Sequence, residues 1–115
     1  MSGFSIKRSK NDYNSNRIFK VSEDGYVEQA GETILTTGAV SPLNLKLKAP
    51  LEGGFCTIKL GDDGGQNAIL TLEGCVMEDG STTVTFTDIK DEVKLNFYEK
   101  GVWILTNSKG SVVVA

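Results

Sequence analysis

Residues 43–48 read Leu-Asn-Leu-Lys-Leu-Lys, with a leucine at every odd position and a polar residue at every even one. Successive side chains of a strand point to opposite faces, so this alternation predicts a β-strand with one buried face and one wet face. Similar short segments follow as far as the last residue, and glycine turns such as 61–65 separate them. We therefore expect an all-β fold of about nine or ten strands, spaced roughly ten residues apart.

The same alternation predicts which side chains are buried. In each segment the apolar residues at every second position share one face. The expected core residues are Leu43, Leu45, Leu47, Cys56, Ile58, Leu60, Ala68, Leu70, Leu72, Val84, Phe86, Val93, Leu95 and Phe97.

Residues 102–105, Val-Trp-Ile-Leu, break the alternation because both faces of this segment are apolar. A strand that is buried on both faces lies beneath another layer of its own domain or beneath a neighbouring subunit. In a chain of 115 residues the second arrangement is credible. Val102, Trp103 and Ile104 are therefore the candidate oligomer interface, with a core position as the alternative for Trp103.

The spacing of the segments divides the chain into two parts. Residues 31–115 are expected to form a single antiparallel β-domain, as a sandwich, a jelly-roll-like fold or a small barrel. Residues 1–30 are expected to form an extended N-terminal arm and a hairpin. The hairpin is predicted because Asp24-Gly25 separates two short alternating runs.

The net charge of −3 is distributed unevenly along the chain. Residues 1–20 carry five basic residues and one acidic residue, whereas residues 21–115 carry seven basic and fourteen acidic residues. A basic arm on an acidic body predicts docking to an acidic surface, and a solvated tail is the alternative. The candidate docking residues are the alternating apolar pair Phe4 and Ile6, and the cations Arg17 and Lys20.

Several classes of partner are not expected. The basic residues are too dispersed for a nucleic-acid-binding face. No apolar run approaches the ~20 residues that span a bilayer, and residues 1–8 lack the apolar region of a signal peptide. We therefore expect neither a nucleic-acid nor a membrane partner.

The sequence also lacks the residues that most catalysis and metal binding require. It contains no histidine, the commonest general base at neutral pH and a usual ligand of zinc and iron. Asp62-Asp63 lies in a glycine loop without the ligand spacing of a calcium loop. This pair, Glu78-Asp79 and Asp91-Glu92 are expected to be solvated turn charges. We expect no enzyme activity, no cofactor and no metal.

The roles of the two cysteines and of three aromatic residues remain open. Cys56 and Cys75 are expected to be reduced, small buried hydrophobes, and a disulfide between them is the alternative. Tyr26, Tyr98 and Trp103 are the aromatic residues that could offer a platform for a sugar.

The segment from about residue 34 to residue 115 resembles small β-domains of tailed-bacteriophage structural proteins. Gly101 and Trp103, in the Gly-x-Trp element before the last strand, are the most telling pair. The elements that carry the resemblance are Thr36–Ser41 (Thr-Thr-Gly-Ala-Val-Ser), Leu51–Lys59 (Leu-Glu-Gly-Gly-Phe-Cys-Thr-Ile-Lys), Thr82–Phe86 (Thr-Thr-Val-Thr-Phe), Val93–Phe97 (Val-Lys-Leu-Asn-Phe), Gly101–Leu105 (Gly-Val-Trp-Ile-Leu) and Gly110–Val114 (Gly-Ser-Val-Val-Val).

The resemblance implies a non-catalytic structural role in the virion. Domains of this group occur as capsid decoration (cement) proteins, often trimeric, that bind the major capsid protein on the outer surface of the shell. They also occur as modules of tail and fibre proteins. The length favours decoration, and the alternative is a tail or fibre receptor- or glycan-binding module with contacts near Asp62–Gln66 and Tyr98–Lys100.

Overall fold

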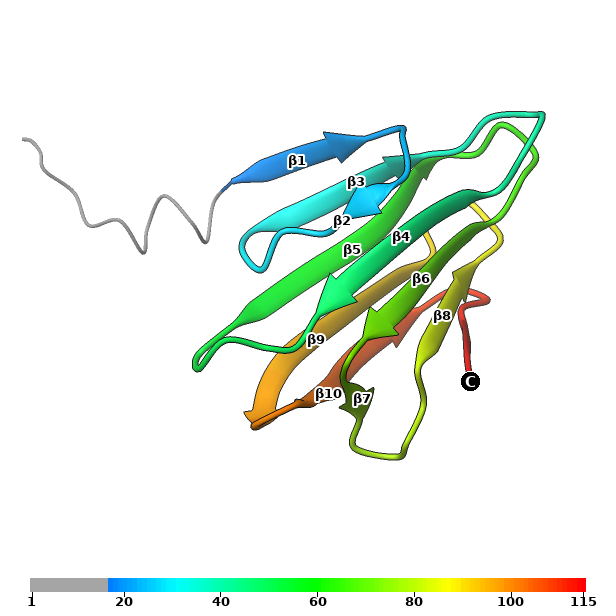
Figure 1. Ribbon diagram of the computed structural model, residues 1–115. Helices are drawn as coiled ribbons and strands as arrows, with labels where there is room; N and C mark the ends of the chain where they lie inside the picture. Colours follow the sequence, from blue (N-terminus) through cyan, green and yellow to red (C-terminus); the bar gives the residue numbers. More distant parts are fainter. Residues whose placement is uncertain (1–16) are drawn as a thin grey trace, which may run out of the picture.

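The computed structural model describes residues 17–115, and this part of the chain is all-β, without a helix (Figure 1). It therefore contains no helix that is long and apolar enough to cross a membrane. The strands are β1 (Ile18–Val21), β2 (Gly25–Tyr26), β3 (Glu32–Thr36), β4 (Leu43–Lys48), β5 (Phe55–Asp62), β6 (Ala68–Glu73), β7 (Val76–Met77), β8 (Thr83–Phe86), β9 (Glu92–Glu99), β10 (Val102–Lys109) and β11 (Val113–Val114).

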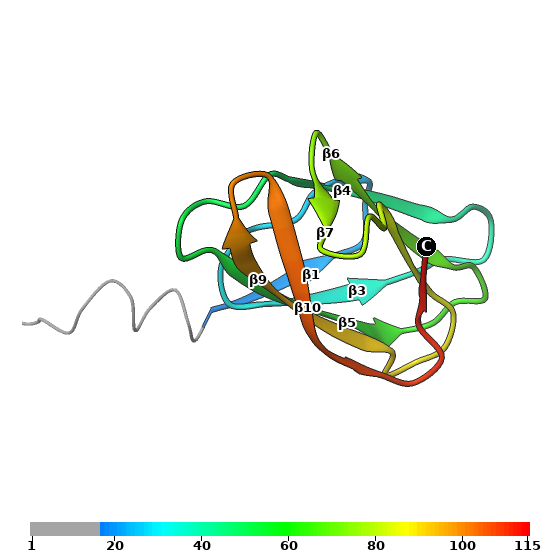
Figure 2. The same cartoon turned by 90° about the horizontal axis from the view of Figure 1, so that it is seen from below.

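The strands form two sheets, and the chain passes from one sheet to the other at almost every connection. The six-stranded sheet has the order β1-β3-β5-β9-β10-β7, and the five-stranded sheet has the order β11-β8-β6-β4-β2. Figure 2 shows β3 and β5 in one layer and β4 and β6 in the other. Of the consecutive strands, β9 and β10 alone pair with each other among the described residues.

This alternation makes the first part of the fold parallel. In the six-stranded sheet β1 pairs with β3 and β3 with β5, and in the five-stranded sheet β2 pairs with β4 and β4 with β6, all in parallel. Each strand reaches its neighbour only after the chain has run through the opposite sheet and returned in the same direction. The expectation of an antiparallel domain over residues 31–115 is therefore wrong for the pairs β3–β5 and β4–β6, and also for β7–β10, which is parallel; both sheets are mixed.

The hairpin expected in residues 17–29 is also wrong. β1 lies in the six-stranded sheet and β2 in the five-stranded sheet, so Asp24-Gly25 carries the chain between sheets. A two-residue type I′ hairpin turn needs positive φ at both central residues, and neither Asp24 nor Gly25 has one. Instead Asp24 Oδ1 accepts a hydrogen bond from the backbone N–H of Asn44 at 2.8 Å. The side chain thus fixes the crossing to the start of β4.

The core contains buried side chains of both sheets in a single cluster. All the side chains expected to be inward are buried except Phe97, which is half-buried. The cluster also contains Val27, Leu35, Met77 and Trp103. The Nε1–H of Trp103, from β10, donates to the carbonyl oxygen of Lys48, at the end of β4, at 3.0 Å. This hydrogen bond joins the two sheets through the core.

The connection between β9 and β10 agrees with the sequence. Residues 100–101 form the turn, and Gly101 has a φ of 76°, a conformation that other residues rarely adopt. The two strands pair antiparallel, with a register shift between Leu105 and Asn107. Thr106 lies at this bulge, and its hydroxyl lies 3.2 Å from the carbonyl oxygen of Lys94.

Candidate functional site

Two of the predicted docking residues lie at one edge of the six-stranded sheet. Arg17 immediately precedes β1, and Lys20 lies within it; both are exposed. The other two, Phe4 and Ile6, lie outside the described residues. β1 is the terminal strand of its sheet, and within residues 17–115 no strand pairs with its outer edge. The N–H and C=O groups along such an edge can accept another strand.

The side chains of β1 divide between the core and the solvent. Phe19 is in register with buried Thr33, and the Arg17 guanidinium carbon lies 4.8 Å from the centroid of the Phe19 ring. Ile18 is 62% exposed and shares its face of the strand with Lys20. Exposed Ile18 and the nearby cations Arg17 and Lys20 give this edge both an apolar contact and positive charge, on a domain that is otherwise mainly acidic.

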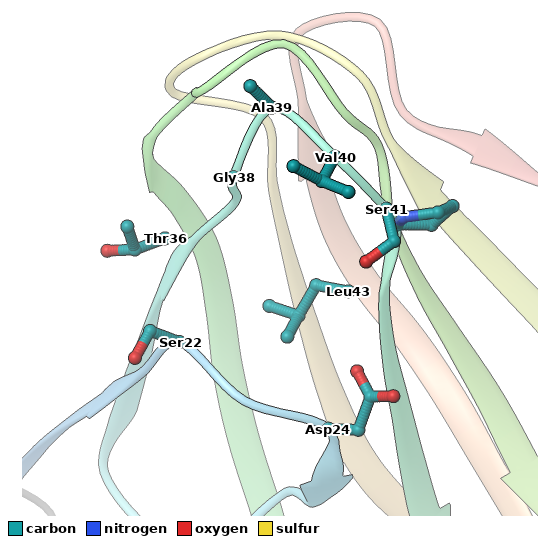
Figure 3. Close-up of a pocket in the computed structure, with 9 residues that line it drawn as sticks. Ser22, Asp24, Thr36, Gly38, Ala39, Val40, Ser41 and Leu43 are labelled. Carbon is teal, nitrogen blue, oxygen red and sulfur yellow. The ribbon is translucent and has the colours of Figure 1, made fainter.

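A polar hollow lies next to this edge, between the β1–β2 connection and the β3–β4 loop (Figure 3). It has a volume of about 200 Å³. Ser22 and Thr36 lie on one side of it, and Asp24 and Ser41 lie on the other. Val40, in the loop above it, is 92% exposed. The hollow thus offers one carboxylate, several hydroxyl groups and one accessible apolar side chain.

A second hollow, of about 340 Å³, shares Asp24 with the first. It is lined by Asp24, Gly25, Tyr26, Asn44 and Lys46. The hydroxyl of Tyr26 donates to Glu73 Oε1 at 2.8 Å, and this hydrogen bond raises the pKa of Tyr26. Glu73 Oε2 lies 3.6 Å from Lys46 Nζ. The Tyr26 ring is therefore held by polar contacts at the surface of the five-stranded sheet.

The candidate oligomer interface is split between two environments. Trp103 has no exposed surface, so in this conformation its side chain contributes to the chain's own core. Val102 and Ile104 alternate with Trp103, are half-buried and face outward. Ile104 is in register with Asn96, which is in register with Phe55, another half-buried residue on the outer face. An interface through Val102 and Ile104 stays a prediction.

The segments expected to contact a receptor or glycan in the alternative function, near Asp62–Gln66 and Tyr98–Lys100, lie at polar turns. Asp63 Oδ1 accepts a hydrogen bond from Gly65 N–H at 2.9 Å, and the Thr37 hydroxyl lies 3.4 Å from the same atom. Tyr98, near the end of β9, is 52% exposed. Among residues 17–115 no group of three or more His, Cys, Asp or Glu residues lies close enough to hold a metal ion.

Two predicted turn charges, Asp91 and Glu92, are not solvated; Glu92 is buried at the start of β9. Asp91 is 1% exposed, which corrects the expectation for this residue. Its carboxylate accepts hydrogen bonds from the backbone N–H groups of Thr87, Asp88 and Ser111 at 2.8–3.0 Å. Burial alone would raise the pKa of Asp91, but these hydrogen bonds and the Ser111 hydroxyl outweigh it and lower the pKa. Asp91 therefore fastens the β10–β11 turn to the β8–β9 loop, which is a structural task.

Both cysteines are free and buried, as expected. Burial raises the pKa of the Cys56 thiol to about 12, and it is also the main reason why the pKa of Cys75 is raised. A thiol becomes nucleophilic only when its pKa is lowered. The two side chains fill the core and offer no reactive thiolate.

Sequence reasoning missed the residues around Asp24 because it placed them in a hairpin. Asp24 and Tyr26 lie beside Asn44 and Lys46 only because β2 pairs with β4 in the other sheet. The exposed aromatic side chain of Tyr26 was the available signal. Its partners belong to strands 20 to 47 residues away, and no local pattern connects them.

No protein-family model matches this chain, and no curated protein matches its sequence.

Proposed function

We propose that this chain is a virion structural protein, namely a capsid decoration (cement) protein that binds the outer capsid surface as a homo-oligomer and stabilises the shell. The observation that carries this proposal is the outer edge of β1, which no strand of residues 17–115 covers and which carries exposed Ile18 and Lys20 on one face, with exposed Arg17 beside Phe19. An edge strand of this kind is suited to binding another protein rather than to transforming a small molecule.

We infer that the partner is the major capsid protein, through an acidic patch with an accessible strand or extended segment. Main-chain hydrogen bonds from β1 would supply the geometry of the contact, and Ile18 would fill an apolar depression. Arg17 and Lys20 would raise the association rate and fix the orientation by charge complementarity. In the same proposal the two sheets form a sandwich and residues 1–16 act as an arm, with Phe4 and Ile6 as further anchors.

Oligomerisation would strengthen this weak contact. A short edge strand buries little area, but linked copies bind several capsid sites at once, and such linkage raises the overall affinity by about 10²–10⁴. Val102 and Ile104 on β10 and Phe55 on β5 are half-buried apolar residues of the outer face of the six-stranded sheet, with Asn96 of β9 between Ile104 and Phe55. We propose that these residues form the contact between copies, most simply in a trimer.

The docking role is tested by co-sedimentation with purified capsid shells of the phage that encodes the chain. Reversing both edge charges, as Arg17→Glu with Lys20→Glu, should weaken shell binding by about tenfold or more because the edge becomes repulsive to an acidic patch. The matched control is Lys100→Glu with Lys109→Glu, which makes the same charge change away from β1. The control should bind like the unmodified protein.

Two results would overturn the docking role. One is shell binding by the β1 variant equal to that of the control. The other is an equal loss in both variants, which would indicate a non-specific charge effect. The oligomer is tested separately by light scattering, where a trimer has three times the 12.4 kDa mass of one chain. Ile104→Lys should reduce that mass to one chain, and a monomeric unmodified protein at micromolar concentration would refute the linkage argument.

A further inference from the structure

The ring of Tyr26 is fixed across the outer face of the five-stranded sheet. Tyr26 lies on β2, its hydroxyl reaches Glu73 on β6, and β4 lies between these strands. Adjacent strands are about 4.8 Å apart, so the side chain must extend along the sheet surface to make this contact. Lys48 Nζ lies 4.8 Å from the centroid of the ring. Tyr26 is nevertheless 50% exposed, and the position of its ring is set before any ligand arrives.

The second hollow described above, the Tyr26 hollow, surrounds this ring with polar groups of different kinds. Asp24 Oδ1 is held by Asn44 N–H, and Oδ2 makes no hydrogen bond within residues 17–115. The side-chain amide of Asn44 likewise makes none with the described residues, and it offers both a donor and an acceptor. Gly25 adds no side chain, and a Cβ at this position would meet no atom within 4 Å. The floor next to the ring is therefore open.

The charges around the hollow are balanced. Asp24 and Glu73 carry negative charges, and Lys46 and Lys48 carry positive ones. Lys46 is paired with Glu73, and exposed Lys48 lies over the ring. A strongly ionic ligand would meet as much repulsion as attraction. A ligand with hydroxyl groups, each of which both donates and accepts, can use the carboxylate, the amide and an ammonium together.

We propose that the Tyr26 hollow binds a neutral monosaccharide unit of a glycan. The apolar C–H face of the sugar packs on the Tyr26 ring, which supplies contact area at little cost in conformational entropy. Its hydroxyl groups pair with Asp24 and Asn44, and exposed Lys48 turns aside from the ring or donates to the same sugar. The volume of about 340 Å³ lies near the lower end of the range of small-ligand sites and suits a single sugar ring.

The proposal is tested by NMR titration of the full-length, isotope-labelled protein with methyl glycosides of glucose, galactose and mannose and with N-acetylglucosamine. An open hollow with one stacking ring predicts a Kd in the millimolar range, on the order of 1–10 mM. The backbone signals of residues 24–26 and 44–46 should shift with at least one of these sugars. Sialyllactose is the charged comparison and should bind no better than the neutral sugars.

Two variants separate stacking from a general loss of exposed aromatic surface. Tyr26→Ala should weaken sugar binding at least about tenfold, the loss of roughly one stacking contact. Tyr98→Ala is the matched control, because Tyr98 is 52% exposed and Tyr26 is 50% exposed. It should leave the Kd unchanged within about twofold. The dispersion of the amide signals shows that each variant is folded.

Four outcomes would overturn the proposal. They are no shifts at about 50 mM of any neutral sugar, shifts confined to other residues, equal effects of the two tyrosine variants, and tighter binding of sialyllactose. The sugar site and the capsid-docking edge fail independently: Tyr26→Ala should still co-sediment with shells, and Arg17→Glu should still bind the sugar.

Discussion

The first six strands and the last four reach the same core by different connections. Strands β1–β6 pair in parallel, so each neighbour in a sheet is reached through the opposite sheet. Strands β8–β11 pair antiparallel among themselves, and β9 and β10 are joined by a two-residue turn. The difference teaches that alternation of side chains decides burial, whereas the loops decide which strands become neighbours.

The two regions also fix their loops differently. In the parallel region, loops of neighbouring strands are linked by exposed or half-buried polar groups, such as Asp24 with Asn44 N–H and Gln29 with the β4–β5 loop, and also by the hydroxyl of buried Thr37, which accepts one backbone N–H of the β5–β6 loop. In the C-terminal region one buried carboxylate, that of Asp91, gathers two loops. Buried hydrogen bonds are costly to lose because the freed groups cannot reach water. The C-terminal region should therefore be the more sensitive to a single substitution.

The largest effect is expected for Asp91→Ala. Three backbone N–H groups lose their acceptor, and each group left without a partner in a buried place costs about 1–3 kcal/mol. The free energy of unfolding should fall by about 4 kcal/mol, allowing for partial rehydration. Urea unfolding followed by tryptophan fluorescence measures it, since Trp103 is in the core.

The control for Asp91 is Asp79→Ala. Asp79 is exposed, and its Oδ1 accepts one hydrogen bond, from Ser81 N–H at 2.9 Å. Water can replace this contact, so the loss should stay below about 1 kcal/mol. Equal losses in the two variants would contradict the view that burial, rather than the turn hydrogen bond itself, makes Asp91 important.

Gly110→Ala should cause the next largest loss in the free energy of unfolding. Gly110 has a φ of 82°, and a Cβ at this position would collide with Asp91 Oδ1. The left-handed backbone alone costs an alanine about 1–2 kcal/mol. The collision adds to this, and a total loss of about 3 kcal/mol is expected because overpacking costs about 1–3 kcal/mol.

Gly80→Ala isolates the backbone part of that loss. Gly80 has a φ of 90°, and a Cβ there would meet no atom within 4 Å. The difference between the two glycine variants in urea unfolding therefore measures the contact with Asp91. If both variants lost the same free energy, the β10–β11 turn would not depend on the position of the Asp91 carboxylate.

Lowering the pH should reduce the free energy of unfolding by a smaller amount, through protonation of Asp91. The pKa of Asp91 is lower in the folded protein than its ordinary value of 3.8, despite burial, because of its backbone hydrogen bonds. The stabilisation from its charge is thus complete above the ordinary pKa and is lost as the pH falls through the lower, folded-state pKa. Protonation keeps oxygen atoms in place as acceptors, so the loss should be less than in Asp91→Ala.

The matched variant for the acid measurement is Asp91→Asn, which has no titratable group at this position. Urea midpoints measured from pH 6 to about pH 2.5 should fall more steeply for the unmodified protein than for the variant. Asp79, whose pKa is also lowered, titrates in both proteins and cancels in the comparison. Parallel curves would show that the charge of Asp91 does not stabilise the fold.

The burial pattern was predictable because it depends on local alternation. Leu43, Leu45 and Leu47 share a face whatever strand lies beside them, and all three are buried. The β9–β10 turn was predictable for the same reason, since the sequence Glu99-Lys100-Gly101 itself predicts a turn, and Gly101 adopts a positive φ there. The parallel pairing was not predictable from such patterns, because an alternating segment does not encode the direction of its neighbour.

The residues of the candidate sites likewise divide into those that a local sequence pattern predicted and those that it did not. Arg17 and Lys20 could be singled out from charge alone, and both are exposed at the edge strand. Asp91 was expected in solvent, because its acidic neighbours and its place between two strands resemble any polar turn. In the fold its carboxylate accepts a hydrogen bond from Ser111, which is 20 residues away in sequence. Residues that are distant in sequence and are brought together only by the fold leave no local sequence pattern that would predict their contact.

The smallest effect, in the parallel region, is expected for Gln29→Ala. The Gln29 side chain donates to the Ala49 carbonyl oxygen and accepts from Leu51 N–H, both at 2.9 Å. Both contacts are accessible to solvent, so water replaces them and the loss in the free energy of unfolding should be about 1 kcal/mol.

Gln66→Ala is the control for Gln29→Ala, because Gln66 is also half-buried and makes one longer contact, of 3.4 Å, with the Ala39 carbonyl oxygen. Its loss should be near zero by the same urea measurement. A loss for Gln29→Ala as large as that of Asp91→Ala would mean that the loops of the parallel region are as critical as the buried carboxylate, and the contrast between the two regions would no longer hold.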